Sequence, residues 1–108
     1  MIRMNHVERK HQLRRMKATV YHMADGAEVL KSYNTIVAIK LSDGTLAFSH
    51  YWTSPDGSMN TKRHITTWCG RDIKTVRAGV LKHLFWTLDY VDSDYLRALE
   101  VATGSHIG

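Results

Sequence analysis

The sequence has little of what secreted and membrane proteins depend on. Cys69 is the single cysteine among 108 residues, so no internal disulfide can form and a reducing compartment is favoured. No run of about 18 apolar residues occurs, which argues against a membrane-spanning helix. The N-terminal residues are charged rather than apolar and do not read as a secretory signal. We therefore expect a cytoplasmic protein that does not contact a membrane.

Acidic residues are scarce in the first part of the chain. Residues 1–17 hold six basic residues and one acidic residue, and this excess equals the formal net charge of +5. An excess placed so unevenly favours an anionic partner. We expect residues 1–15 to form a basic N-terminal arm, as a helix or a loose segment, beside one domain over residues 16–108. If translation starts at Met16 rather than Met1, the arm is absent.

The centre of the sequence predicts a β-hairpin. Two runs rich in β-forming residues, 32–41 and 45–52, flank a turn at residues 42–44 that ends in a glycine. Alternating residues that would share one apolar face are Val37, Ile39, Leu41, Leu46, Phe48, His50 and Trp52. A further strand is expected over residues 16–23, whereas residues 28–31 fit either a strand or a helical turn.

Helices are expected in the second half, after the loop that holds Pro55, the only proline. The predicted helical segments are residues 62–69, 72–88 and 93–102, with Asn60 or Thr61, Asp72 and Ser93 as their N-caps. Gly70 would end the first helix, and residues 104–108 would fray. Strands followed by helices imply an α+β fold, with a small antiparallel sheet of about three strands and two or three helices packed on one face.

Two short motifs carry a resemblance to known proteins. Ser32-Tyr33-Asn34-Thr35-Ile36-Val37-Ala38 reads as a strand, and Asn60-Thr61-Lys62-Arg63-His64-Ile65 reads as a helix start. Together they resemble a group of short phage- and plasmid-encoded proteins of unassigned activity, over roughly residues 28–69. The resemblance implies a phage origin, the cytoplasm of a bacterial host and a compact strand–strand–helix core. It marks Ser32, Tyr33, Thr35 and His64 as a structural motif.

His64 is open to two interpretations. A histidine near hydroxyl groups could act as a general base in a small nuclease, together with His50. Alternatively, its ring hydrogen-bonds Tyr33 or Thr35 and fixes a helix onto the hairpin, because buried polar groups need partners. No second candidate catalytic residue lies at a sequence spacing typical of an active site. The sequence also contains no glycine-rich loop of the kind that binds phosphate groups. We therefore predict a structural role for His64 and assign no catalytic residue.

Several histidines could in principle bind zinc together with the cysteine. The residues concerned are His22, His50, His64, His83 and Cys69. Their spacing matches no C-x-x-C or H-E-x-x-H pattern, which zinc sites commonly use. We predict neither a metal site nor a cofactor.

Basic side chains in the helical half give the strongest functional hint. The predicted partner-binding residues are Lys62, Arg63, Arg71, Lys74, Arg77 and Lys82, with Tyr51 and Trp52 as aromatic contacts. Lysine and arginine bind phosphates, although a run of charge can also be only a solvated face. We expect a non-catalytic protein that occludes nucleic acid or a host nucleic-acid-handling protein, such as a CRISPR or other defence component. The alternatives are the His64 nuclease and a self-assembling structural phage protein.

Overall fold

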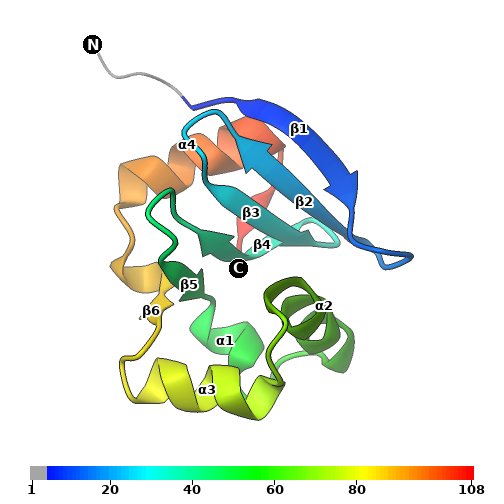
Figure 1. The fold of residues 1–108 in the computed structure, drawn as a ribbon, viewed down its shortest axis with the longest axis vertical. Coiled ribbons are helices and arrows are strands. Elements are labelled where there is room, and N and C mark those ends of the chain that lie inside the picture. The colour runs from blue at the N-terminus through cyan, green and yellow to red at the C-terminus, as the bar shows by residue number, and fades with distance from the viewer. Residues whose placement is uncertain (1–4) are drawn as a thin grey trace.

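A seven-stranded sheet forms the centre of the computed structural model, which describes residues 5–108 (Figure 1). Its strands are β1 (Val7–Gln12), β2 (Ala18–Met23), β3 (Glu28–Ser32), β4 (Thr35–Lys40), β5 (Leu46–Phe48), β6 (Trp86–Thr87) and β7 (His106–Ile107). Strands β1 to β5 form an antiparallel meander. The two short strands, β6 and β7, pair in parallel with β5 and β4.

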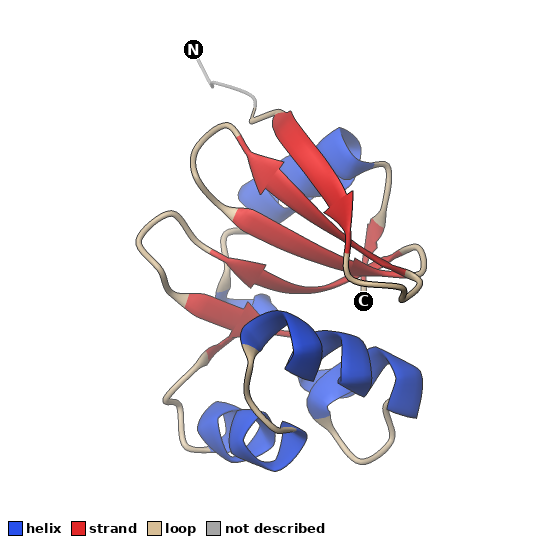
Figure 2. Ribbon diagram, turned by 45° about the vertical axis from the view of Figure 1, so that its right-hand side comes forward, coloured by secondary structure: helices blue, strands red, loops and turns tan. Residues whose placement is uncertain are grey.

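The helices cover both faces of this sheet. They are α1 (His50–Thr53), α2 (Met59–Cys69), α3 (Ile73–Leu81) and α4 (Ser93–Thr103), with a 3-10 turn, η1 (Leu88–Tyr90), before α4. Figure 2 shows α4 behind the strands, away from the other helices. The fold is α+β as predicted, but the prediction of about three strands with helices on one face is wrong.

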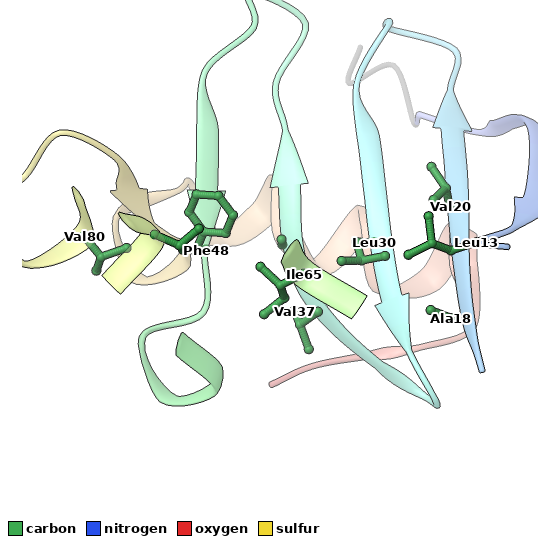
Figure 3. Packing of buried hydrophobic residues seen from close by; sticks show 10 residues of the cluster. Leu13, Ala18, Val20, Leu30, Val37, Phe48, Ile65 and Val80 are labelled. Carbon is green, nitrogen blue, oxygen red and sulfur yellow. The ribbon is translucent and has the colours of Figure 1, made fainter. Parts of the chain in front are cut away.

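The sheet separates two hydrophobic clusters, and Figure 3 shows the one beneath α2 and α3. Its buried members are Leu13, Ala18, Val20, Leu30, Val37, Ala38, Phe48, Ile65, Val76 and Val80. The cluster beneath α4 contains Tyr21, Met23, Ala27, Val29, Ile36, Ile39, Ala47, Leu88, Val91 and Leu99. Burying one large aliphatic side chain contributes roughly 1.5–3 kcal/mol, so both helical layers hold the sheet in place.

Strand β4 lies between the two clusters and is buried on both faces. Its residues Ile36, Val37, Ala38 and Ile39 are each 0% exposed. A register shift in the ladder between β3 and β4 makes Val37 an extra residue, so Val37 and Ala38 both contact the first cluster. The predicted single apolar face is therefore wrong here, because a continuous apolar run is typical of a strand covered on both sides.

The predicted second strand of the hairpin ends earlier than expected. β5 stops at Phe48, and the Ser49 hydroxyl then accepts a hydrogen bond from the Trp52 N–H, at 3.4 Å. A serine in this position caps a helix. His50 and Trp52 consequently lie in α1 instead of on a strand face.

The helix ends follow the capping residues. Ser58, not Asn60 or Thr61, caps α2, whereas Gly70 ends it in a left-handed conformation as predicted. The predicted cap Asp72 begins α3, but Asp92 takes the place predicted for Ser93 at the start of α4. Cap preferences alone leave such neighbouring polar residues equivalent.

Helix α3 ends at Leu81 and does not continue to residue 88 as predicted. The chain reverses through His83, whose φ is 57°, and the N–H groups of Leu84 and Phe85 donate to the Gly79 carbonyl. A Cβ atom added at Gly79 would lie 2.4 Å from Cδ2 of Phe85. Absence of a side chain at Gly79 therefore lets Phe85 fold back against the helix.

Both ends of the described chain are strands. Residues 7–12 pair with β2, so the expected helical or loose arm is a strand over this range. Residues 106–107 pair with β4 instead of fraying. Over residues 5–108, no helix combines the length and apolar character needed to cross a membrane.

Candidate nucleic-acid interface

The meander places its four turns at two opposite ends of the sheet (Figure 1). The β1–β2 and β3–β4 turns lie at one end, and the β2–β3 and β4–β5 turns lie at the other. The first turn carries Arg14, Arg15 and Lys17, whereas the turns at the opposite end carry Asp25 and Asp43. Topology thus separates charges of opposite sign.

We define the basic end as Arg14, Arg15, Lys17, Lys31, Tyr33, Asn34, Asn60 and Arg63. The parts of the chain at this end, residues 12–17, 31–35 and 59–63, contain no acidic residue. Among residues 5–108 the ion pairs are His6–Glu8 and Lys40–Glu28, and neither uses a cation of the basic end. These cations are therefore available to an external anion.

Hydrogen bonds join the two turns and α2 into one surface. The Tyr33 N–H donates to the Lys17 carbonyl at 2.9 Å, which ties the β3–β4 turn to the β1–β2 turn. Asn60 lies in the first turn of α2. Its side-chain amide donates a hydrogen bond to the Tyr33 hydroxyl, with the two atoms 3.4 Å apart. Arg63 follows one helical turn later and is exposed.

A buried hydroxyl–imidazole cluster fixes α2 to the sheet. Ser32 Oγ lies 2.7 Å from His64 Nδ1 and 3.0 Å from Thr61 Oγ1, and all three side chains are buried. Burial, followed by the nearby charge of Arg63, lowers the pKa of His64, so its ring is neutral near pH 7. Buried hydroxyls on a neutral imidazole form a structural joint that positions α2 beside the β3–β4 turn.

The motif residues meet only in part. The partner of His64 is Ser32 and not the expected Tyr33 or Thr35. Tyr33 packs beside the imidazole, with ring centroids 5.7 Å apart. Thr35 instead lies in β4, where it is in register with Ser32 and His106.

Tyr33 has an unusual backbone conformation. Its φ is 55°, in the left-handed region, inside the two-residue turn that joins β3 and β4. Such turns favour glycine, asparagine or aspartate, since other side chains cost roughly 1–2 kcal/mol there. The residue is nevertheless 48% exposed. A strained backbone at an exposed aromatic residue is typical of a functional position, so Tyr33 is a candidate functional residue.

A shallow groove of about 410 Å³ opens beside Tyr33. Its lining residues are Gln12, Met16, Lys17, Ala18, Thr19, Lys31, Tyr33 and Asn34. Two lysines therefore line the groove together with Tyr33 and with residues that carry amide or hydroxyl groups. Lys31 also lies over the ring of Tyr21, with Nζ 5.3 Å from the centroid, which limits its motion.

The predicted basic set is less available than the sequence indicated. Lys62 is buried and donates from Nζ to the Pro55 carbonyl, while Nε of Arg77 donates to the Thr53 carbonyl at 2.9 Å. These two cations hold the α1–α2 loop and α1. The other predicted cations, Arg63, Arg71, Lys74 and Lys82, are exposed, and the guanidinium of Arg71 lies over the Phe85 ring.

The two predicted aromatic contacts lie on α1, which packs against α3. Tyr51 is exposed, and its ring meets that of Trp52 edge to face at 4.9 Å. Trp52 is half-buried against the first hydrophobic cluster. Of the residues predicted to bind a partner, Arg63 alone belongs to the basic end. Its other cations were absent from that prediction, although the excess charge of residues 1–17 was a signal for three of them, Arg14, Arg15 and Lys17.

The histidines and the cysteine do not gather. Among residues 5–108, no three histidine, cysteine or acidic side chains are placed to hold a metal ion. His22 instead stacks on His11, with Nε2 and Nδ1 3.2 Å apart. Burial raises the pKa of the Cys69 thiol, so it is a poor thiolate ligand.

Comparison with known proteins identifies one family. Residues 4–82 match a family of unknown function, DUF8033. The matched region includes β1, both turns of the basic end, α2 and α3. No curated protein and no solved structure matches the chain.

Proposed function

We propose that this chain, which belongs to the DUF8033 family, is a non-catalytic module that binds nucleic acid through its basic end. One observation carries the proposal: basic residues from three segments lie at one end of the sheet, and the parts of these segments found there contain no acidic residue. Phosphate groups are the most abundant anions arranged to meet such a surface. The bound strand would be occluded from other proteins.

The number of cations sets an expected salt dependence. Arg14, Arg15, Lys17, Lys31 and Arg63 could meet about five phosphates. The logarithm of the binding constant would then fall with the logarithm of salt at a slope near −4.5 for duplex DNA, or about −3.5 for a single strand. A slope near zero would contradict contact with phosphates.

The surroundings of His64 favour binding over nuclease chemistry. Its Nδ1 is occupied by the Ser32 hydroxyl, and both side chains lie beneath the surface. A general base must come within hydrogen-bond reach of the proton that it removes. A buried histidine with a structural partner does not meet that requirement.

The edge strand β1 argues against assembly through the sheet. Its sequence, Val-Glu-Arg-Lys-His-Gln, is polar after Val7 and carries three consecutive charged residues, and residues 8–12 are exposed. Charged edge strands resist pairing with a second sheet. A phage source remains a prediction from the motif resemblance. A role against bacterial immunity remains a prediction from the small, basic, single-domain chain without a recognisable active site; there the occluded strand would belong to a host nucleoprotein.

Fluorescence polarisation with labelled oligonucleotides at low salt tests the proposal. Replacing Arg15 and Lys17 with glutamine should weaken binding at least tenfold, because two phosphate contacts are lost. The matched control replaces Lys74 and Arg97, two exposed cations elsewhere, and should change binding less than twofold. Equal losses in both variants, or no binding by the wild type, would refute the proposed surface.

A further inference from the structure

We infer that the basic end takes an unpaired nucleobase, stacked on Tyr33, and therefore prefers single-stranded nucleic acid to duplex. This inference deepens the proposed function and rests on it. Three observations support it: the conformation of Tyr33, the contacts that hold its ring, and the groove beside it.

The turn places an aromatic residue where other residues would fit with less strain. Tyr33 has a φ of 55° in a two-residue turn, yet the next residue, Asn34, tolerates such a conformation better. Packing does not account for the tyrosine, because about half of its surface is exposed. An exposed ring in a strained turn supports a role for Tyr33 in contacting a binding partner.

The ring is held in place before any ligand arrives. One side packs against His64, and the hydroxyl accepts from the Asn60 amide. His64 is itself fixed by its bond to Ser32. A ring already held in one orientation loses little conformational entropy on binding, which favours its use as a stacking platform.

The groove offers what a nucleotide needs beside that ring. Its volume of about 410 Å³ falls within the range of small-ligand sites, roughly 300–1,000 Å³. Lys17 and Lys31 can meet phosphates on either side of a base. The side chains of Gln12 and Asn34 carry donors and acceptors for base edges.

Stacking distinguishes the two forms of nucleic acid. In a duplex the faces of the bases are covered by neighbouring base pairs, so a protein meets base edges and the backbone. In a single strand the faces are free, and aromatic side chains stack on them. An exposed tyrosine between lysines therefore fits an unpaired strand.

The test uses three ligands of equal phosphate number: a short thymidine strand, the same strand without bases, and a blunt-ended duplex without a loop. Tyr33→Leu should weaken binding of the thymidine strand by about 5- to 100-fold. Tyr33→Phe keeps the ring and should stay within twofold of the wild type. The wild type should bind the strand without bases more weakly than the thymidine strand by a similar factor. The Tyr33→Leu variant should bind these two strands with nearly equal affinity.

Thermal unfolding identifies any variant that fails to fold, and Tyr33→Asn, which suits a positive φ, then replaces Tyr33→Leu. Duplex binding as tight as the thymidine strand, or equal affinity for the strand without bases, would overturn this inference. Salt-dependent binding would persist in that case, and the proposed function would stand. Absence of binding to all three ligands at low salt would refute both.

Discussion

The two ends of the sheet carry opposite charges and use them differently. At the acidic end, the Asp25 carboxylate accepts bonds from the Ala27 N–H and the Tyr95 hydroxyl, and Asp43 accepts from the Thr45 N–H. Asp92 caps α4. At the basic end, the cations form no ion pair with any group in residues 5–108. The acidic side chains therefore stabilise the fold through hydrogen bonds, whereas the basic side chains remain free to bind an anionic partner. We accordingly expect changes at the acidic end to affect stability, and changes to the cations of the basic end to affect binding.

The largest expected change in stability comes from removing the His64 side chain, which fixes α2 to the sheet at the basic end. His64→Ala leaves the hydroxyls of Ser32 and Thr61 without their buried partner and opens a cavity, so the free energy of unfolding should fall by about 3 kcal/mol. Urea denaturation measures the change. Thr66→Ala, which removes one hydroxyl elsewhere on α2, should cost less than about 1 kcal/mol. Equal costs would show that the cluster is not a structural joint.

The pH dependence of stability follows from the same histidine. Burial lowers the pKa of His64 in the folded state, so the unfolded state binds a proton first as pH falls. Wild-type stability should be constant above about pH 7 and decline from about pH 6.5 to 5. The difference between wild type and His64→Ala should shrink over the same range. A constant difference from pH 8 to 5 would contradict a buried, neutral imidazole.

At the acidic end, a charge change should affect stability and leave binding unchanged. Burial opposes the shift, but hydrogen bonds from Ala27 and Tyr95 lower the pKa of Asp25 below its usual value. Its contribution is therefore present above about pH 4 and lost as pH falls through the lowered pKa. Asp25→Asn should cost about 1 kcal/mol at pH 7, and less at pH 3, without changing oligonucleotide affinity. Altered affinity would place the acidic end in the interface.

The smallest expected change in stability occurs at Tyr33. Tyr33→Asn relieves the strained backbone but loses ring contacts with His64, so these effects nearly cancel and the midpoint of thermal unfolding should move only slightly. Calorimetry measures this shift, and the oligonucleotide assay should show weaker binding by the same sample. Loss of stability together with binding would make Tyr33 a structural residue.

Local signals in the sequence predicted much of the secondary structure. The strand near residues 18–23, the cap at Asp72 and the left-handed Gly70 follow from residue type and spacing. The number of strands did not follow: β1 was expected as a helical or loose arm, and the segment of β3 fitted either a strand or a helical turn. β6 and β7 were missed because they are two residues each and exist only through their partners β5 and β4. Pairing across the fold, not local propensity, creates such strands.

The candidate site was harder to predict for a similar reason. The sequence shows that positive charge is concentrated in residues 1–17 and 62–82. It does not show which of these cations form no contact within the chain and can bind a partner. Lys62 and Arg77 bond to carbonyl groups of the chain, and only the folded structure reveals this. The meander unites the basic segments, since it brings Lys17 opposite Tyr33. Contacts between separate strands and helices, which local residue patterns do not reveal, therefore determine which cations are free and which lie together.

The most direct measurement is a nuclear magnetic resonance titration of the labelled protein with a short single strand. Backbone amide signals of residues 14–17, 31–34 and 60–63 should shift in proportion to the bound fraction. Signals of residues 25–27, 42–45 and 92–95 at the acidic end should stay in place. Shifts centred on the acidic end or on α3, or no shifts at low salt, would contradict the account.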